Sequence, residues 1–302
     1  MAFSNFEELI ERAKAGPRRR IAVARAESRG VLEALARAGG LGLVEPILVG
    51  DREEIRRAAD GIDGAREWVV EHVSGDDQAV SRAAVAAVGS GAADLLMKGK
   101  VPTVTLFRAV LDRELGLPRQ GPLSHIAMVE VPFYHKLFAA TDGALNLHPD
   151  LELKSAIVRN AVAAFHALGC ARPKVALLSY VETVNPKDPE TTDCRRLVER
   201  GAAGEFGEAA VEGPLAIDLC LSRAAAATKG VSGEVPGDAD ILVAPDITVI
   251  NASVKALILA GGTAAGALLG ASAPIVALSR SDTPRERLCS IALACALVGA
   301  PN

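Results

Sequence analysis

The chain has 302 residues, half of them apolar, 23% charged and only 3% aromatic, with a formal net charge of −4. This length favours two domains, and the composition supplies a hydrophobic core and excludes a disordered protein. The acidic balance, with Arg18-Arg19-Arg20 as the only basic cluster, argues against nucleic acid as a partner.

The cysteines and the longest uncharged stretch bear on location. Five cysteines are scattered without a C-x-x-C pair, which indicates reduced thiols and a cytoplasmic protein. The opening MAFSNFEELIERAKAG predicts an amphipathic helix and lacks the pattern of a signal peptide. Residues 256–279 carry no charge and are long enough to span a bilayer, but Gly261-Gly262 and Pro274 interrupt them. We therefore expect a helix and parallel strands buried in the core here, and no membrane contact.

Short apolar runs alternate with helical patterns along the chain. Strands are predicted at 20–26, 44–50, 67–73, 94–99, 125–131, 174–179, 208–213, 240–245 and 274–279. The best marked helix, 150–169, has Asp150 as a candidate N-cap, one apolar face and Gly169 at its end. This alternation predicts an α/β fold with mostly parallel sheets, and a break near 140–150 separates two series of units.

In such folds, ligands bind beyond the carboxyl ends of the strands. Polar residues follow an apolar run in the segments MKGKVPT, SYVETVNPKDPETTD, VEGPLAID and SRSDT. The nucleotide-binding fingerprints fail, because GGLGLVE lacks a third glycine and GGTAAG lacks the Lys-Ser/Thr pair of a P-loop. Metal-ligand and nucleophile-elbow motifs are also missing from the sequence.

The segment SRSDT joins a strand to a helix. The sequence TPRE at 283–286 predicts a capping box, which directs a helix N-terminus at Ser279, Arg280 and Asp282. A helix N-terminus beside a guanidinium suits an anion. A surface ion pair between Arg280 and Asp282 is an equally good interpretation of the spacing.

Two other segments carry candidate ligand groups. In MKGKVPT two lysines flank a glycine, a pattern that suits the binding of a phosphate or a carboxylate. The alternative interpretation is two solvated lysines without a ligand. In TDGALN hydrogen-bonding side chains stand at the domain joint, where an Asp-Gly turn is the alternative. The candidate ligand groups of these segments are Lys98, Lys100, Thr103, Thr141, Asp142 and Asn146.

Together these stretches resemble the phosphate acyltransferase family, the phosphate acetyl- and butyryltransferases. The likeness runs through ADLLMKGKV, LSHIAMVEVPFYHK, TDGALNLHPDLELK, LSYVETVNPKDPETTD, VEGPLAIDLCLS and GASAPIVALSRSD, and covers nearly the whole chain. The versions of MKGK, VNPK and GPLA are closer to the butyryl-type branch.

The resemblance implies two α/β/α domains with mostly parallel sheets facing a cleft, similar to isocitrate and isopropylmalate dehydrogenases. The first domain would comprise 1–140 plus 284–302 and the second 141–283, with the active site in the cleft. It also implies a homodimer or higher homo-oligomer, no metal and no permanently bound cofactor. The substrates would be coenzyme A or acyl-CoA and inorganic phosphate.

The implied reaction is acyl-CoA + phosphate = acyl phosphate + CoA, by direct transfer of a short acyl group in a ternary complex. Arg280 would stabilise the developing charge, and Ser279 would donate a hydrogen bond rather than become acylated. The base would be Asp282 or Glu286, with Asp282 slightly favoured because Glu286 serves the capping box. Further substrate-binding candidates are Ser179, Glu182, Gly213, Pro214, Asp246 and Asn251.

The chain also departs from the family pattern. Pro102 stands where a polar residue is common and removes an N–H donor, and Gly143 replaces a usual alanine. Two other functions are alternatives: a metal- and NAD-dependent hydroxyacid dehydrogenase of the same fold, and a non-catalytic CoA-binding module. The first needs clustered metal ligands, which the sequence lacks, and the intact Ser279-Arg280 pair argues against the second.

Overall fold

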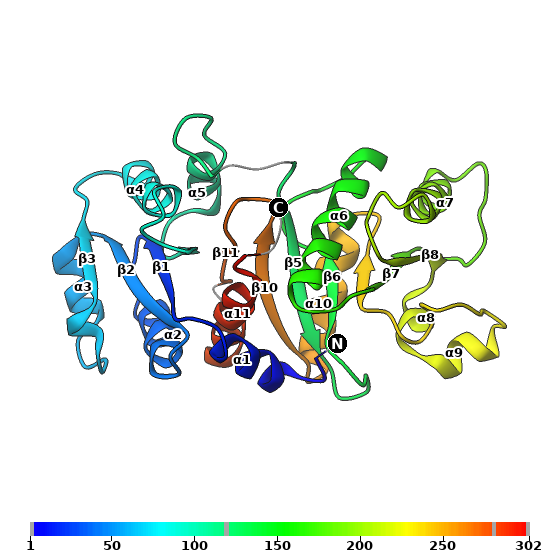
Figure 1. Ribbon diagram of the computed structural model, residues 1–302, viewed down its shortest axis with the longest axis horizontal. Coiled ribbons are helices and arrows are strands. Elements are labelled where there is room, and N and C mark those ends of the chain that lie inside the picture. The colour runs from blue at the N-terminus through cyan, green and yellow to red at the C-terminus, as the bar shows by residue number, and fades with distance from the viewer. Residues whose placement is uncertain (1–2, 118–120, 280–281, 300–302) are drawn as a thin grey trace. The chain divides into compact units, whose positions relative to one another are not determined.

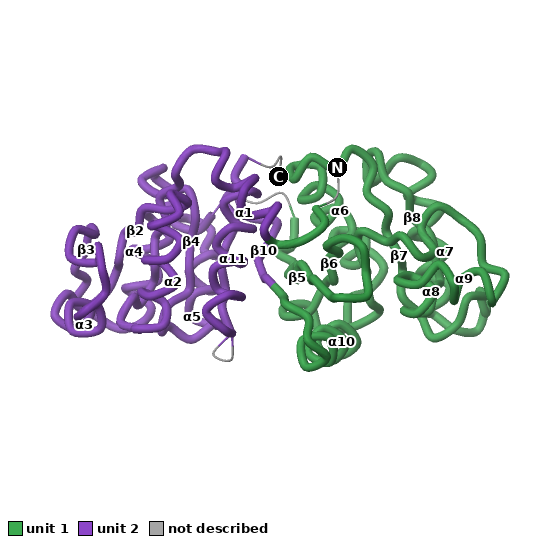
Figure 2. Tube along the Cα trace, turned by 90° about the horizontal axis from the view of Figure 1, so that it is seen from below, with its two compact units in different colours: residues 1–6, 121–264, 300–302 green, residues 7–120, 265–299 purple. Residues whose placement is uncertain are grey.

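A computed structural model describes residues 3–117, 121–279 and 282–299. The chain divides into two compact units (Figure 2). Unit 1 takes in Gly121–Ala264 and the residues up to Phe6, and unit 2 takes in Glu7–Gln120 and Ala265–Gly299. These divisions fall earlier in the chain than 140 and 283, the boundaries expected from sequence.

Unit 2 is a strand–helix series whose strands lie in the order β3-β2-β1-β4-β11-β10. All neighbours are parallel except β10 and β11. Its elements are α1 (Phe6–Lys14), β1 (Arg19–Ala24), α2 (Arg29–Gly40), β2 (Val44–Gly50), α3 (Arg52–Ala58), the 3-10 turn η1 (Ala65–Glu67), β3 (Val69–His72), α4 (Asp77–Gly89), β4 (Leu95–Lys98), α5 (Thr103–Val110), β10 (Thr263–Leu269), β11 (Ile275–Val276) and α11 (Pro284–Leu297).

Helices cover both faces of the unit 2 sheet (Figure 1). Ile21 and Val23 of β1 share one hydrophobic core with apolar residues of α2 and α11. The alternate residues Ala22 and Ala24 are equally buried but point to the opposite face, where α4 packs with α5 beside it. Burial on both faces explains why the strands read as continuous apolar runs.

Unit 1 repeats this layering with the strand order β5-β6-β9-β7-β8. Its strands are parallel except for the antiparallel pair β5 and β6. The elements are β5 (Ser124–Glu130), β6 (Phe138–Thr141), α6 (Leu151–Ala167), β7 (Lys174–Leu178), α7 (Pro189–Ala202), β8 (Ala210–Leu215), α8 (Ile217–Leu221), α9 (Arg223–Thr228), β9 (Ile241–Val243) and α10 (Ile247–Leu259).

The predicted α/β class with a mostly parallel sheet is confirmed. The 150–169 helix is confirmed as α6, and the Asp150 side chain accepts a hydrogen bond from Leu153 N at 2.9 Å. The strand β6 was missed. Its short sequence FAAT has two alanines, which are poor strand formers, and pairing with β5 and β9 on either side holds it in the sheet.

The uncharged stretch 256–279 is only partly buried. Strands β10 and β11 lie in the core as expected, although they pair antiparallel. Helix α10 departs from the prediction, because Ile250 is its only fully buried residue and Leu259 is 89% exposed. An apolar sequence alone does not reveal which face a helix packs. Within the described ranges, no helix has the length and apolar character needed to cross a membrane.

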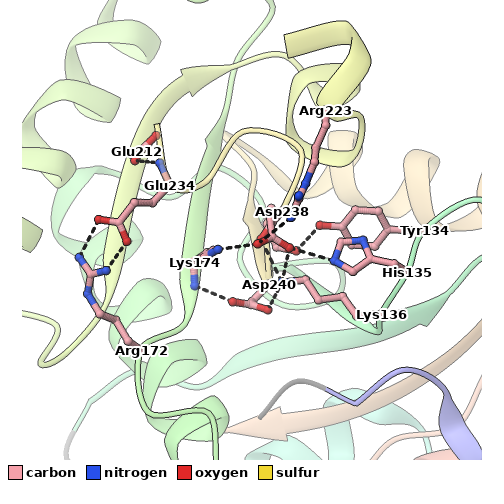
Figure 3. A network of polar contacts seen from close by, with 11 residues as sticks. Tyr134, His135, Lys136, Arg172, Lys174, Glu212, Arg223, Glu234, Asp238 and Asp240 are labelled. Carbon is pink, nitrogen blue, oxygen red and sulfur yellow. Dashed lines mark hydrogen bonds and ion pairs between the residues drawn. The ribbon is translucent and has the colours of Figure 1, made fainter. Parts of the chain in front are cut away.

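A charged network lies at the amino ends of β7 and β9 in unit 1 (Figure 3). Lys136 Nζ donates hydrogen bonds to Asp240 Oδ1 at 2.6 Å and to the Asp238 carbonyl at 3.0 Å. Asp240 also accepts from the Lys174 backbone N–H at 2.8 Å, and the Lys174 ammonium pairs with the Asp238 carboxylate. The network therefore braces the sheet at the edge opposite to the carboxyl ends of these strands.

Candidate active site

The carboxyl ends of β4 and β11 bring two predicted segments of unit 2 to one edge. These strands are parallel neighbours, with Leu96 opposite Ile275 and Met97 opposite Val276. Lys98 at the end of β4 and Ser279, three residues after β11, consequently lie at the same edge of the sheet, where the strands have their carboxyl ends. Arg280, the residue expected to stabilise charge, lies outside the described residues.

The strand-to-helix turn is closed by side-chain hydrogen bonds. Ser279 N donates to Asp282 Oδ2 at 2.6 Å, and Asp282 N donates to the Ser279 carbonyl at 3.3 Å. Thr283 Oγ1 accepts from Glu286 N at 3.2 Å, while Thr283 N donates to Glu286 Oε2 at 2.7 Å. The predicted capping box is therefore confirmed, and it sets the positive end of α11 against this turn.

Both candidate bases are tied to backbone groups. Glu286 is buried and occupied by the capping box. Asp282, which sequence reasoning took to be without a structural duty, accepts the Ser279 N–H. Burial raises the pKa of Asp282, and the Glu286 carboxylate adds to this rise, whereas the Ser279 N–H and the Arg287 guanidinium oppose it. A carboxylate with a raised pKa is the better proton acceptor for a thiol.

The lysine loop after β4 presents its two ammonium groups differently. Lys98 Nζ donates to the carbonyls of Gly99 and Val101, both at 3.3 Å, so it helps to shape the loop. The side chain of Lys100 is exposed, and the backbone N–H of Lys100 donates to the Arg25 carbonyl at 2.7 Å. Thr103 begins α5, as expected. The outward cation of this loop is thus Lys100.

Sequence reasoning missed Arg25, which extends from the end of β1 at the same edge. Its Nε donates to Asp77 Oδ1 at 2.6 Å, its Nη2 donates to the Gly75 carbonyl at 2.9 Å, and Glu27 lies 3.6 Å from Nη1. Burial alone would lower the pKa of Arg25, but the bonds and charges of Asp77 and Glu27 raise it. The sequence signal for Arg25 was a cation directly after a strand. It was overlooked because the predicted strand, 20–26, included Arg25.

In unit 1 the parallel strands β6, β9, β7 and β8 likewise share a carboxyl edge. Thr141 ends β6, Ser179 follows β7, and Asp246 follows β9. Asp246 caps α10, accepting from Thr248 N at 2.7 Å and Val249 N at 3.2 Å. The topology therefore brings these candidates to one edge, as expected for Ser179, whereas the strand before Thr141 was not predicted.

The loop after β6 uses its polar groups internally. The buried Asp142 carboxylate accepts from His125 N at 3.1 Å, from Asn146 Nδ2 at 2.6 Å and from two N–H groups of its own loop. Thr141 Oγ1 donates to the His125 carbonyl, and Asn251 Nδ2 donates to the Gly143 carbonyl at 3.1 Å. These side chains hold the shape of the loop and dock α10 beside it.

The remaining candidates lie around β7 and β8. Ser179 N donates to the Leu215 carbonyl at 2.9 Å, at the ends of both strands. Gly213 has φ +156°, and a Cβ there would stand 2.7 Å from Leu177 Cβ, so a glycine is required before Pro214. Away from these strand ends, Glu182 accepts from Lys229 Nζ at 2.8 Å.

Residues 76–295 match a family described as phosphate acetyl/butaryl transferase. The chain belongs to this phosphate acyltransferase family. It is 40% identical to the phosphate butyryltransferase of Clostridium acetobutylicum over 98% of both chains, and 37% identical to the phosphate acetyltransferase of Rhizobium meliloti over 96% of this chain and 92% of that one. Family membership confirms the acyltransferase class expected from the sequence and does not favour the dehydrogenase or the binding module.

Solved structures agree with the family assignment. The branched-chain phosphotransacylase from Enterococcus faecalis has a TM-score of 0.84 and 34% identity, covering 93% of this chain and 99% of that one. A 4-hydroxythreonine-4-phosphate dehydrogenase from Salmonella typhimurium, at 12% identity and TM-score 0.58 over 93% and 99% of the two chains, shares the fold alone. Among the residues of this phosphate acyltransferase that the structure describes, no group of three or more His, Cys, Asp or Glu could hold a metal ion.

Proposed function

We propose that this chain transfers a short acyl group, acetyl through butyryl, between coenzyme A and inorganic phosphate. A phosphate oxygen attacks the thioester carbonyl carbon, the C–O bond forms, the C–S bond breaks, and coenzyme A leaves as a thiolate that takes up a proton. Coenzyme A is a substrate here and no cofactor is bound permanently. The match to phosphate butyryltransferase over 98% of both chains carries this proposal.

Within this reaction we assign Arg280 to the negative charge that develops on the carbonyl oxygen. Ser279 donates a hydrogen bond to the phosphate or to this oxygen and is not acylated. Asp282 acts as the base toward the coenzyme A thiol in the reverse direction, with Glu286 as the alternative. The raised pKa of Asp282 supports the first choice, as does its bond to the Ser279 N–H, which holds it at the turn.

The substrate-binding residues proposed here come from both units. Lys100 offers an exposed ammonium at the sheet edge that also bears Ser279. Most of the unit 1 candidates act by shaping the loops at the carboxyl ends of their strands, as their internal hydrogen bonds indicate. The full proposed set is Lys98, Lys100, Thr103, Thr141, Asp142, Asn146, Ser179, Glu182, Gly213, Pro214, Asp246 and Asn251.

We further propose a cytoplasmic homodimer or higher homo-oligomer whose units have the layered, dehydrogenase-like fold. None of the five cysteines, all of which lie in the described ranges, forms a disulfide, and this accords with a reducing compartment. The apolar helix α10, with Leu259 89% exposed, is the surface proposed to pack against a second copy. The fold assignment is supported by the likeness to the Salmonella dehydrogenase.

Phosphate-dependent thiol release from C2–C6 acyl-CoA thioesters, followed with a thiol-reactive dye, tests the function. We expect turnover that requires phosphate and falls about a hundredfold or more in Arg280→Ala. The matched control is Arg285→Ala, because Arg285 is an exposed arginine paired with Glu7. Coenzyme A binding without turnover on any thioester would support the binding module, and metal-dependent NAD reduction would support the dehydrogenase.

A further inference from the structure

The guanidinium of Arg287 lies near the Asp282 carboxylate. Arg287 lies on α11 one helical turn after the N-cap Thr283, and its charge acts on Asp282 by lowering the pKa of that carboxyl. Arg287 Nε is buried and has no hydrogen-bond partner in the described part of the chain. Such a group normally finds an acceptor, because an unpaired buried donor is costly.

The Arg287 guanidinium also lies against the first turn of α2. A Cβ placed on Gly30 would stand 2.1 Å from Arg287 Nη1, so the guanidinium lies directly against the Gly30 backbone. The N-cap of α2, Ser28, makes no side-chain cap bond. A cation at the positive end of a helix is unfavourable by itself, and a bound anion would relieve both charges.

The comparison with Arg285 makes the position of Arg287 distinctive. Arg285, two residues earlier on the same helix, is exposed and pairs with Glu7 at 2.6 Å. Arg287 is partly buried, and no carboxylate lies within ion-pair distance of it among the described residues. Arg285 therefore forms a surface ion pair, whereas no carboxylate of the described residues pairs with the Arg287 guanidinium.

We propose that Arg287 binds a phosphate group of the substrates and positions it beside Ser279 and Asp282. This rests on the proposed function and adds a residue to it. A guanidinium matches phosphate because it donates two parallel N–H···O bonds. The phosphate belongs either to the reacting inorganic phosphate or acyl phosphate, or to coenzyme A.

The test measures KM for phosphate and for acyl-CoA in Arg287→Gln, with Arg285→Gln as the matched control. We expect KM for one substrate to rise about tenfold or more in Arg287→Gln, because a charged hydrogen-bond donor is lost. Arg287→Lys should recover part of the loss, and Arg285→Gln should stay within about twofold of wild type. Repeating the assay with acyl-pantetheine, which lacks the nucleotide phosphates, tells the sources apart. A rise seen with acyl-CoA but not with acyl-pantetheine places Arg287 at coenzyme A, and a rise in KM for phosphate places it at the reacting group.

Gly30→Ala provides an independent variant that keeps the arginine. The new methyl group displaces the guanidinium, while alanine favours the helix more than glycine does. We expect the same KM to rise without a fall in melting temperature. Unchanged KM values in both Arg287→Gln and Gly30→Ala, with wild-type turnover intact, would overturn the role of Arg287 alone. A wild-type protein without phosphate-dependent turnover would instead overturn the proposed function.

Discussion

Removing the ammonium group of Lys136 should destabilise unit 1 by breaking the network at the amino ends of β7 and β9 (Figure 3). Lys136 is 8% exposed and Asp240 3% exposed, so Lys136→Met leaves a buried carboxylate without its cation. Breaking such a pair costs about 3–5 kcal/mol. Asp240 keeps the Lys174 N–H and Asp238 keeps the Lys174 ammonium. We therefore expect the lower end, a loss of about 3 kcal/mol in the free energy of unfolding.

The pH dependence of this loss follows from Asp238. Burial alone would raise the pKa of Asp238, but hydrogen bonds from Lys174 and Lys136 together outweigh it and hold the pKa well below its usual value. A lowered pKa contributes stability above the pKa of the unfolded state, and that stability disappears as the pH falls through the folded pKa. Without Lys136 the pKa of Asp238 rises, so acid unfolding should begin at a higher pH than in the wild type.

Urea unfolding followed by circular dichroism at pH 7 and at lower pH measures both effects. Lys14→Met is the control, since Lys14 pairs with Glu11 on the surface and should contribute less than about 1 kcal/mol. Adding Asp240→Asn to Lys136→Met should restore part of the stability, because it removes the unpaired charge. A loss below about 1 kcal/mol for Lys136→Met, or no recovery in the double variant, would refute the claim that this pair is buried and coupled.

Further predictions concern the catalytic turn and α10. Asp282→Asn should lower the rate of acyl-CoA formation from acyl phosphate about a hundredfold. It should also remove the acid limb of the pH–rate profile, which in the wild type lies above the ordinary aspartate pKa because burial raises the pKa of Asp282. A limb that persists in the variant would implicate Glu286 as the base. Thr283→Val should cost about 1 kcal/mol in urea unfolding through loss of the cap, and no change would contradict the capping role. Leu259→Asp should convert a dimer to a monomer, as measured by light scattering, whereas Val69→Asp, on an exposed strand, should leave the dimer intact. Equal masses for the wild type and both variants would exclude α10 as the interface.

Several features of the fold were predictable because their causes are local. The alternation of apolar runs and amphipathic segments specifies strands and helices within a few residues of themselves. The TPRE capping box and the Asp150 cap need only side chains that reach three residues along the chain. The resemblance to the family likewise depends on ordered stretches of sequence, and it indicated the acyltransferase class without coordinates.

Tertiary structure decided which polar groups are already used and which are left over. Asp142 looked like a ligand group, but its partner His125 comes from a neighbouring strand and ties it into the loop. Arg287 looked like any helical arginine until Gly30, distant in sequence, was found against its guanidinium. The exposure of α10 was hidden for the same reason. Hydrogen-bond satisfaction and burial depend on contacts between distant segments, and no local pattern of residues encodes those contacts.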